Sequence, residues 1–112
     1  MDETRAAELL AGERRRVEQL LAETRRDGAS DREAAKADGD IADPAERLTA
    51  EEVDDAIAGA LRARLDAIER AEARLRAGTY GRSVRSGLPI PDDRLEADPA
   101  AELTVEEAAT EA

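Results

Sequence analysis

The sequence predicts a mainly α-helical protein: a long antiparallel coiled-coil hairpin, followed by a small C-terminal module with a short terminal helix. Two stretches, residues 2–37 and 49–77, repeat apolar side chains at three- and four-residue steps, as amphipathic helices do. The segments between and after them are rich in Gly, Pro and Asp and lose that period. We therefore divide the 112 residues into a hairpin, 1–77, with its tip near 38–48, and a C-terminal module, 78–112.

Asp2 and Glu3 mark the start of the first helix. The Asp2 side chain can accept the free amides of the first turn, and Glu3 suits the positive end of the helix dipole. Gly28 is a potential stop, because glycine costs about 1 kcal/mol inside a helix. Either the helix ends there and another begins at the capping box in residues 30–33, or it kinks and continues to about residue 37. The side chains at helical spacing are Leu9, Leu10, Glu13, Val17, Leu20, Leu21 and Thr24.

The clearest helix start in the sequence is the capping box Thr-Ala-Glu-Glu at residues 49–52. Before it, Gly39 and Pro44 indicate a turn, since the residue that precedes a proline is driven out of the helical region. The second helix runs until Gly78, and its narrow apolar stripe needs a partner along its length. That stripe consists of Val53, Ile57, Leu61, Leu65, Ile68, Ala71 and Leu75.

The first helix can be that partner in an antiparallel register. The register places Gly28 opposite Ile57, where the absent side chain leaves room for the isoleucine, and this favours the continuous first helix. Because it depends on apolar spacing alone, a shift by one heptad stays open. We expect a monomer, although a narrow exposed stripe could equally pair between two chains. The opposing pairs are Leu10 with Leu75, Val17 with Ile68, Leu21 with Leu65, and Thr24 with Leu61.

Turn-forming residues dominate the beginning of the C-terminal module. Gly and Pro recur over residues 78–91 and indicate tight turns around short extended pieces. Asp92 or Asp93 is expected to cap a short helical turn that Pro99 ends. Thr-Val-Glu-Glu at residues 104–107 is another capping box and opens the last short helix. The predicted core of the module consists of Tyr80, Val84, Leu88, Ile90, Leu95, Leu103 and Val105.

Composition excludes several kinds of chemistry. The chain has no Cys and no His, so it lacks disulfides, thiolate nucleophiles, imidazole ligands and a Ser-His-Asp triad. We expect no catalytic residue, no cofactor and no enzyme activity. Its 28 acidic against 17 basic residues argue against binding a nucleic-acid backbone. No apolar run approaches the roughly 18 residues that span a bilayer, and the N-terminus has no signal-peptide pattern, so we expect no membrane partner and a cytoplasmic location.

The C-terminal module contains an ordered series of short motifs. They read Gly-Thr-Tyr-Gly at 78–81, Ser83-x-x-Ser86-Gly87, Pro-Ile-Pro at 89–91, Arg-Leu-Glu-Ala at 94–97 and Pro-Ala at 99–100. This series resembles the zinc finger of the DksA/TraR family, whose members carry GTYG-x-C-x-x-C-G, then PIP-x-x-RLEA-x-P-x-A, then C-x-x-C. Placed without gaps, the four family cysteines fall on Ser83, Ser86, Thr104 and Glu107. The resemblance therefore implies a zinc-finger-like module that has lost every metal ligand.

The loss of the thiolates has a physical consequence. Structural zinc can contribute on the order of 10 kcal/mol to the folding of a small finger. Without it the module must be held by turns, caps and packing, and the hydroxyls of Ser83, Ser86 and Thr104 can bond turn amides but do not usefully bind zinc at neutral pH. We expect a metal-free module that is ordered but only marginally stable.

The resemblance also implies a function. DksA-like proteins are similar to the predicted hairpin in having a coiled coil with an acidic tip that enters the secondary channel of bacterial RNA polymerase. The family's tip reads approximately D-x-x-D-x-A; here Asp43 matches, Glu46 keeps the charge and Leu48 replaces the small Ala. We expect a transcription regulator that binds RNA polymerase without contacting DNA, through a tip formed by Asp43, Glu46, Arg47 and Leu48.

Other interpretations stay open. Acidic residues are common in turns, so Asp43 and Glu46 can serve local structure alone. The chain could be a coiled-coil adaptor that kept the scaffold and lost the polymerase role. The arginines at 14–16 and 25–26 are expected to form a solvated, ion-paired face. The sequence leaves open which promoters respond, whether control is positive or negative, and whether a nucleotide alarmone takes part.

Overall fold

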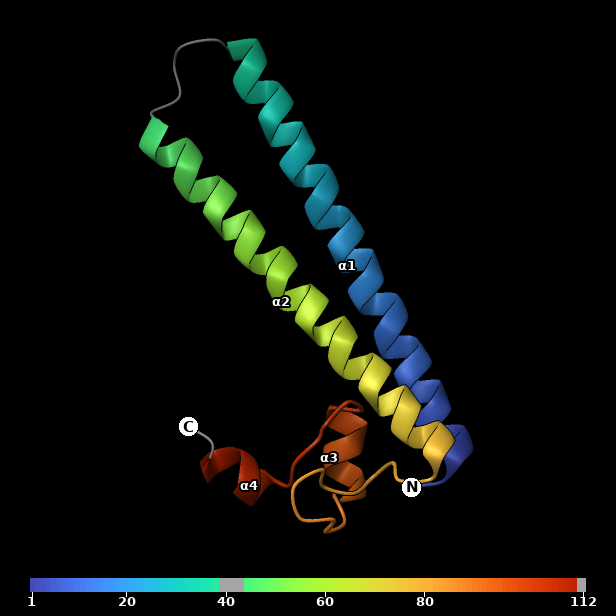
Figure 1. The fold of residues 1–112 in the computed structure, drawn as a ribbon. Coiled ribbons are helices and arrows are strands. Elements are labelled where there is room, and N and C mark those ends of the chain that lie inside the picture. The colour runs from blue at the N-terminus through green and yellow to red at the C-terminus, as the bar shows by residue number, and fades with distance from the viewer. Residues whose placement is uncertain (39–43, 111–112) are drawn as a thin grey trace. The chain divides into compact units, whose positions relative to one another are not determined.

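The computed structural model describes the backbone of residues 1–38 and 44–110, and the side chains of residues 1–26 and 52–110. The described residues are mainly helical, which confirms the predicted class, and their only β-pairing is an isolated antiparallel bridge between residues 82 and 89. None of the described helices combines the length and apolar character needed to cross a bilayer. The helices are α1 (Glu3–Asp38), α2 (Pro44–Ala77), α3 (Asp92–Ala97) and α4 (Val105–Thr110) (Figure 1).

The chain forms two compact units. Unit 1 consists of Met1–Arg15 and Asp66–Ala112, and thus contains the start of α1, the end of α2, and both short helices. Unit 2 consists of Arg16–Leu65, within which α1 and α2 run in opposite directions (Figure 1). The division between the units falls inside both long helices. The predicted boundary between two domains, after residue 77, is a statement about which parts of the chain fold independently, and it stays a prediction.

Helix α1 begins at the predicted cap and passes through the predicted stop. Asp2 Oδ1 accepts the backbone N–H groups of Thr4 (2.7 Å) and Arg5 (3.2 Å), which satisfies two of the free amides at the helix start. The helix continues through Gly28 to Asp38. Of the two alternatives, the continuous first helix is therefore confirmed, and an end at Gly28 is wrong.

Helix α2 begins at Pro44, before the capping box at residues 49–52 that we expected to start it. The predicted turn over 38–48 is therefore wrong in its second half, which is helical. The physical reason is that proline is well suited to the first helical position: its ring fixes φ near the helical value, and its missing N–H would have no intrahelical partner there.

Burial in unit 2 follows only part of the predicted stripe. Val17, Leu21 and Ala58 are buried, whereas Leu20, Val53 and Ile57 are 38 to 52% exposed. The expectation that these last three are covered is wrong. For Val53 and Ile57 the reason lies in the sequence of α1, which contains no large apolar residue from Ala22 to its end at Asp38.

Unit 1 has an apolar layer between the start of α1 and the end of α2. Leu10 and Ile68 are fully buried there, together with the small side chains of Ala6 and Ala71. Beside this layer Arg14 donates from Nε (3.4 Å) and Nη2 to the two carboxylate oxygens of Glu72. In the predicted register Arg14 and Glu72 lie opposite each other to within one residue. Their side chains are half-buried rather than fully solvated.

A tight turn over residues 81–90 opens the C-terminal module. The N–H of Ser83 donates to the carbonyl of Leu88 (2.8 Å), and the N–H of Ile90 donates to the carbonyl of Gly81 (2.8 Å). Gly81 and Gly87 have φ values of +85° and +75°, a region that side chains rarely adopt. The predicted tight turn around short extended pieces is thus confirmed, and glycine is required at both positions.

The core of the module is smaller than predicted. Ile90, Leu95 and Ala101 are buried and Tyr80 packs against them, as expected for three of these four residues. The expected core positions Val84, Leu88 and Val105 are wrong, since each is more than half exposed. Val84 lies in the turn that follows the buried Ser83, and its side chain faces solvent.

The short helix α3 has no side-chain cap. Pro91 precedes it and makes no capping hydrogen bond, and Asp92 is already helical, so the expected cap by Asp92 or Asp93 is wrong. Both carboxylates instead lie in the first turn, where the helix dipole favours negative charge. The helix ends at Ala97 because Asp98, which precedes Pro99, adopts a non-helical conformation.

Candidate functional site

The candidate site is built from the four positions at which the resembled family has cysteines. Ser83 and Ser86 belong to the 81–90 turn, while Thr104 and Glu107 belong to the start of α4. Their polar atoms contact one another through a connected set of hydrogen bonds. We call this set the hydroxyl–carboxylate cluster. The four positions that the sequence singled out are therefore brought together in the fold.

Thr104 and Glu107 form the predicted capping box. The N–H of Glu107 donates to Thr104 Oγ1 (3.2 Å), and the N–H of Thr104 donates to Glu107 Oε1 (3.1 Å). Each residue thus satisfies a backbone amide of the other at the start of α4. The prediction of a capping box at residues 104–107 is confirmed in both of its bonds.

Ser83 connects the turn to this capping box. Its hydroxyl donates to Glu107 Oε2 (2.9 Å) and accepts the N–H groups of Arg85 (3.1 Å) and Ser86 (3.2 Å). A serine hydroxyl has one proton to donate and two lone pairs, so its hydrogen-bonding capacity is fully used. The side chain is only 4% exposed, and these bonds compensate its burial.

The environment of Glu107 favours its charged form. The N–H of Thr104 lowers the pKa of the Glu107 carboxyl, and the hydroxyls of Ser83, Thr104 and Ser86 act in the same direction, while partial desolvation opposes them. Glu107 is therefore an ionised acceptor at neutral pH. Since both of its carboxylate oxygens are occupied, it is a structural group rather than a proton donor or acceptor for a substrate.

These residues do not fit the zinc ion of the resembled family. Zinc in structural sites takes thiolate or imidazole ligands, and the cluster offers three neutral hydroxyls and one carboxylate. The hydroxyl of Ser83 has no remaining lone pair, and both oxygens of Glu107 accept hydrogen bonds within the protein. Among the described residues no group of three or more acidic side chains is arranged to hold a metal ion.

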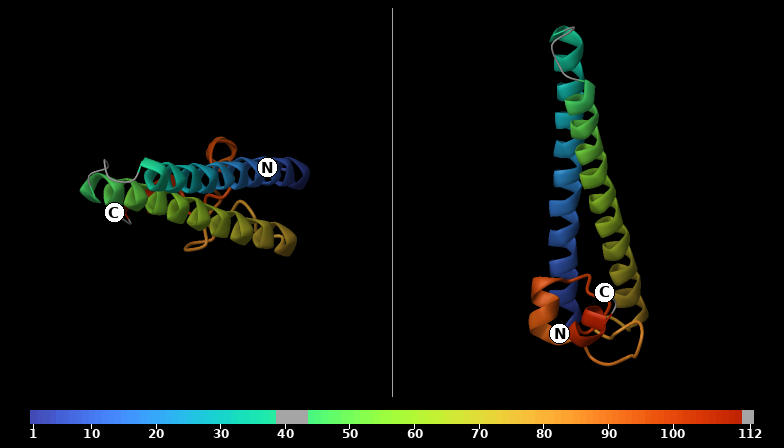
Figure 2. Two further views of the ribbon diagram at one scale, coloured as in Figure 1. Left: turned by 90° about the horizontal axis from the view of Figure 1, so that it is seen from above. Right: turned by 90° about the vertical axis from the view of Figure 1, so that its left-hand side faces the viewer.

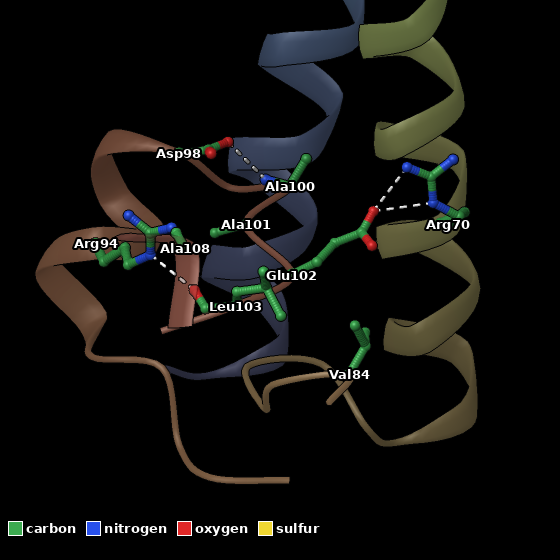
Figure 3. A pocket seen from close by; sticks show the side chains of 9 residues that line it. All are labelled: Arg70, Val84, Arg94, Asp98, Ala100, Ala101, Glu102, Leu103 and Ala108. Carbon is green, nitrogen blue, oxygen red and sulfur yellow. Dashed lines mark hydrogen bonds and ion pairs between the residues drawn. The ribbon is translucent and has the colours of Figure 1, made fainter. Parts of the chain in front are cut away.

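A shallow groove lies beside the cluster, between α2 and the C-terminal module (Figure 3). On one wall Arg70 Nε donates to Glu102 Oε1 (2.9 Å). On the other, Arg94 Nε donates to the carbonyl of Leu103 (2.9 Å), so both guanidinium groups are engaged by the protein itself. The groove is shallow and open.

A second ion pair joins α3 to α1 within unit 1. Arg5 donates from Nε (3.0 Å) and Nη2 (2.7 Å) to the two oxygens of Glu96, and Figure 2 shows α3 beside the first turns of α1. The hydrogen bond from Arg5 lowers the pKa of Glu96, and the same bond raises the pKa of Arg5. The pair is exposed, so its role is to orient α3 rather than to stabilise it strongly.

Tyr80, the only aromatic residue, has the predicted role of an anchor. Its ring packs against the module core, and its hydroxyl donates to the carbonyl of Pro99 (2.8 Å). Burial raises the pKa of Tyr80. The bond links the Gly-Thr-Tyr-Gly motif to the Pro-Ala motif.

The other predicted site, the acidic tip, lies outside the described side chains. Asp43 is among residues 39–43, which the structure does not describe, and Glu46, Arg47 and Leu48 are described only as helical backbone in the first turns of α2. The tip residues thus stay a prediction.

Sequence analysis missed the ion pairs of unit 1. Arg5, Arg70 and Glu102 were not singled out, because each bonds a residue remote in the chain. No local pattern identifies such partners. The Arg14–Glu72 ion pair is different, because the predicted antiparallel register places these two residues opposite each other and could have indicated their contact.

Comparisons with known proteins give a likeness of structure and none of sequence. No family model matches the sequence, and no curated protein matches it significantly. Among solved structures, transcription factor DksA2 from Pseudomonas aeruginosa matches with 23% sequence identity and a TM-score of 0.47, over 92% of this chain and 82% of that chain. At this level of similarity no residue role passes from that protein to this chain.

Proposed function

We propose that this chain regulates transcription by binding bacterial RNA polymerase through its secondary channel, without contacting promoter DNA. The observation that supports the proposal most is the ordered motif series from Gly78 to Ala100, together with its folded form. The series assigns four positions to the cysteines of the resembled family. These positions, of which Ser83 is the first and Glu107 the last, meet in one hydrogen-bonded cluster although they are up to 24 residues apart. A chance match to short motifs would not place these positions together.

The proposed mechanism acts at the tip of the hairpin. In this proposal the predicted coiled-coil pairing of α1 and α2, helices of 36 and 34 residues, is the element that presents Asp43 and Glu46 to the partner. Carboxylates delivered near the catalytic magnesium of a polymerase would perturb ion or substrate binding there. Regulation is then allosteric, because the hairpin alters the partner's equilibrium between conformations rather than reading DNA.

The charge of the chain supports a protein partner over DNA. A net charge of −11 repels a phosphate backbone, which argues against contact with promoter DNA. The same proposal makes the chain a cytoplasmic monomer without enzyme activity. In support of the last point, the described carboxyls whose pKa departs from its ordinary value, those of Glu96 and Glu107, have it lowered, away from the range of a general acid at neutral pH.

A pull-down with core RNA polymerase tests the proposal. The unmodified chain should bind, and the double substitution Asp43→Asn plus Glu46→Gln should weaken binding because it removes both tip carboxylates. The matched control is Glu52→Gln plus Asp55→Asn, which removes two exposed carboxylates at the same three-residue spacing further along α2. Absence of binding, or equal loss in both variants, contradicts the proposed role of the tip.

A second candidate function is favoured by one specific observation. Leu20, Val53 and Ile57 are exposed in unit 2, and such apolar side chains on a paired helix can take up a helical partner. A coiled-coil adaptor would use exposed apolar side chains of this kind. If Val53→Ser plus Ile57→Ser abolishes association with a partner while the tip substitutions do not, the adaptor function replaces the first proposal.

A further inference from the structure

We infer that the hydroxyl–carboxylate cluster is a metal-free closure of the C-terminal module, in which the Glu107 carboxylate takes the structural place that a metal ion has in the resembled zinc finger. The inference concerns how this module is held together and does not depend on the proposed function.

The first argument is the connection that the cluster makes. A structural metal stabilises a small module by joining two segments that are remote in the chain. Glu107 makes the same connection, because its two oxygens accept from Ser83 in the turn (2.9 Å) and from the N–H of Thr104 at the start of α4 (3.1 Å). The turn and α4 are thus joined through one anion.

The second argument is that the cluster also organises the turn itself. Hydrogen bonds around a structural metal site orient its ligands and help to fix the segments that carry them. Here Ser83 Oγ accepts the N–H groups of Arg85 (3.1 Å) and Ser86 (3.2 Å), and Ser86 Oγ accepts the N–H of Leu88 (3.2 Å). The serine hydroxyls therefore supply the acceptors that the turn needs.

The third argument is completeness. Ser83 and Thr104 are 4% and 8% exposed, and each of their hydroxyls has a partner, as does each oxygen of Glu107. A cation introduced among them would have to displace these bonds and would meet only one negative charge. The arrangement is therefore closed without an ion, and adding zinc gives no stabilisation.

The variant Glu107→Gln tests the inference, because glutamine has one acceptor oxygen where the carboxylate has two. Either the Ser83 hydroxyl or the Thr104 N–H then loses its acceptor, and the amides of Ser86 and Thr104 should exchange with solvent about tenfold faster. The matched control is Glu106→Gln, an exposed glutamate in the same turn of α4 that carries the same charge change. Exchange in this control should equal that of the unmodified chain.

Two further measurements complete the test. Ser83→Ala removes the link between the turn and α4 with little change in volume, and it serves where Glu107→Gln does not fold; it should raise exchange at Arg85 and Ser86. A chelator, or one equivalent of zinc, should leave the melting temperature of the full chain unchanged. A stoichiometric zinc adduct in native mass spectrometry, a melting temperature lowered by chelator, or equal exchange in Glu107→Gln and Glu106→Gln would overturn the inference.

Discussion

The hydroxyl of Ser83 lies 2.9 Å from a carboxylate oxygen of Glu107, 24 residues later in the chain. The bond joins a turn to the first turn of α4, and both partners are also bonded to backbone amides of their own segments. The donor is the neutral Ser83 hydroxyl and the acceptor is the Glu107 carboxylate, so the hydrogen bond is charge-assisted. The link between these two residues therefore closes the C-terminal module between its turn and its last helix.

Restoring thiolates at the four converging positions should create a zinc site. We expect the quadruple variant Ser83→Cys, Ser86→Cys, Thr104→Cys and Glu107→Cys to bind one zinc per chain, because four thiolates can then surround an ion at about 2.3 Å. Cobalt substitution reports tetrahedral thiolate coordination by its visible absorption. The control carries only Ser83→Cys and Ser86→Cys. If the quadruple variant binds cobalt no better than this control, the four positions do not converge in solution.

Acid should weaken the module through Glu107. Its pKa is lowered in the folded protein, so the stability that its ionised form contributes is present above the ordinary carboxyl pKa and is lost as pH falls through the lowered value. The difference in urea midpoint between the unmodified chain and Glu107→Gln should therefore shrink between about pH 6 and pH 3. Taking this difference cancels the other carboxylates, which titrate in both proteins. A difference that does not change with pH would contradict the account.

Two isoleucines of α2 should respond differently to the same truncation. Ile68 is fully buried in unit 1, so Ile68→Ala should lower the free energy of unfolding by about 2–5 kcal/mol. Ile57 is 45% exposed in unit 2, so Ile57→Ala should cost less than about 1.5 kcal/mol. Chemical denaturation of both variants measures this. Equal losses would mean that Ile57 is covered in solution, as the sequence alone predicted.

Tyr80 offers a spectroscopic measure of module folding, since it is the only aromatic residue. Burial raises its pKa, so the absorbance change of phenolate formation should occur at higher pH in the folded chain than in urea. Tyr80→Phe removes the bond to the Pro99 carbonyl and should cost about 1 kcal/mol. Coincident titrations in buffer and in urea would show that the ring is solvated.

Much of the fold could be predicted from local sequence. The Asp2 cap and the capping box of Thr104 and Glu107 depend on bonds within one helical turn, and both are found as expected. The start of α2 at Pro44 was not expected. Two signals for a helix start lie close together there, and the proline, which suits the first helical position, prevails over the later capping box.

Burial was harder to predict than helix position. The stripe of α2 looks uniform in sequence, yet Val53 and Ile57 are exposed, and α1 contains no large apolar residue after Leu21. The convergence of Ser83 with Glu107 came from the resemblance to a known motif series, whereas their hydrogen bonds depend on chain geometry that spacing alone does not specify. Ion pairs such as Arg5–Glu96 have no local sequence signal at all.

The most direct test of the proposed function is photocross-linking from position 43 to bacterial RNA polymerase. A photoreactive amino acid in place of Asp43 should cross-link to the polymerase subunits that line the secondary channel, and an excess of the unmodified chain should suppress the product. The same group in place of Arg25, an exposed side chain on α1, is the reference. Cross-linking from position 43 that is no greater than from position 25, in chains that both fold, would contradict a polymerase-binding tip.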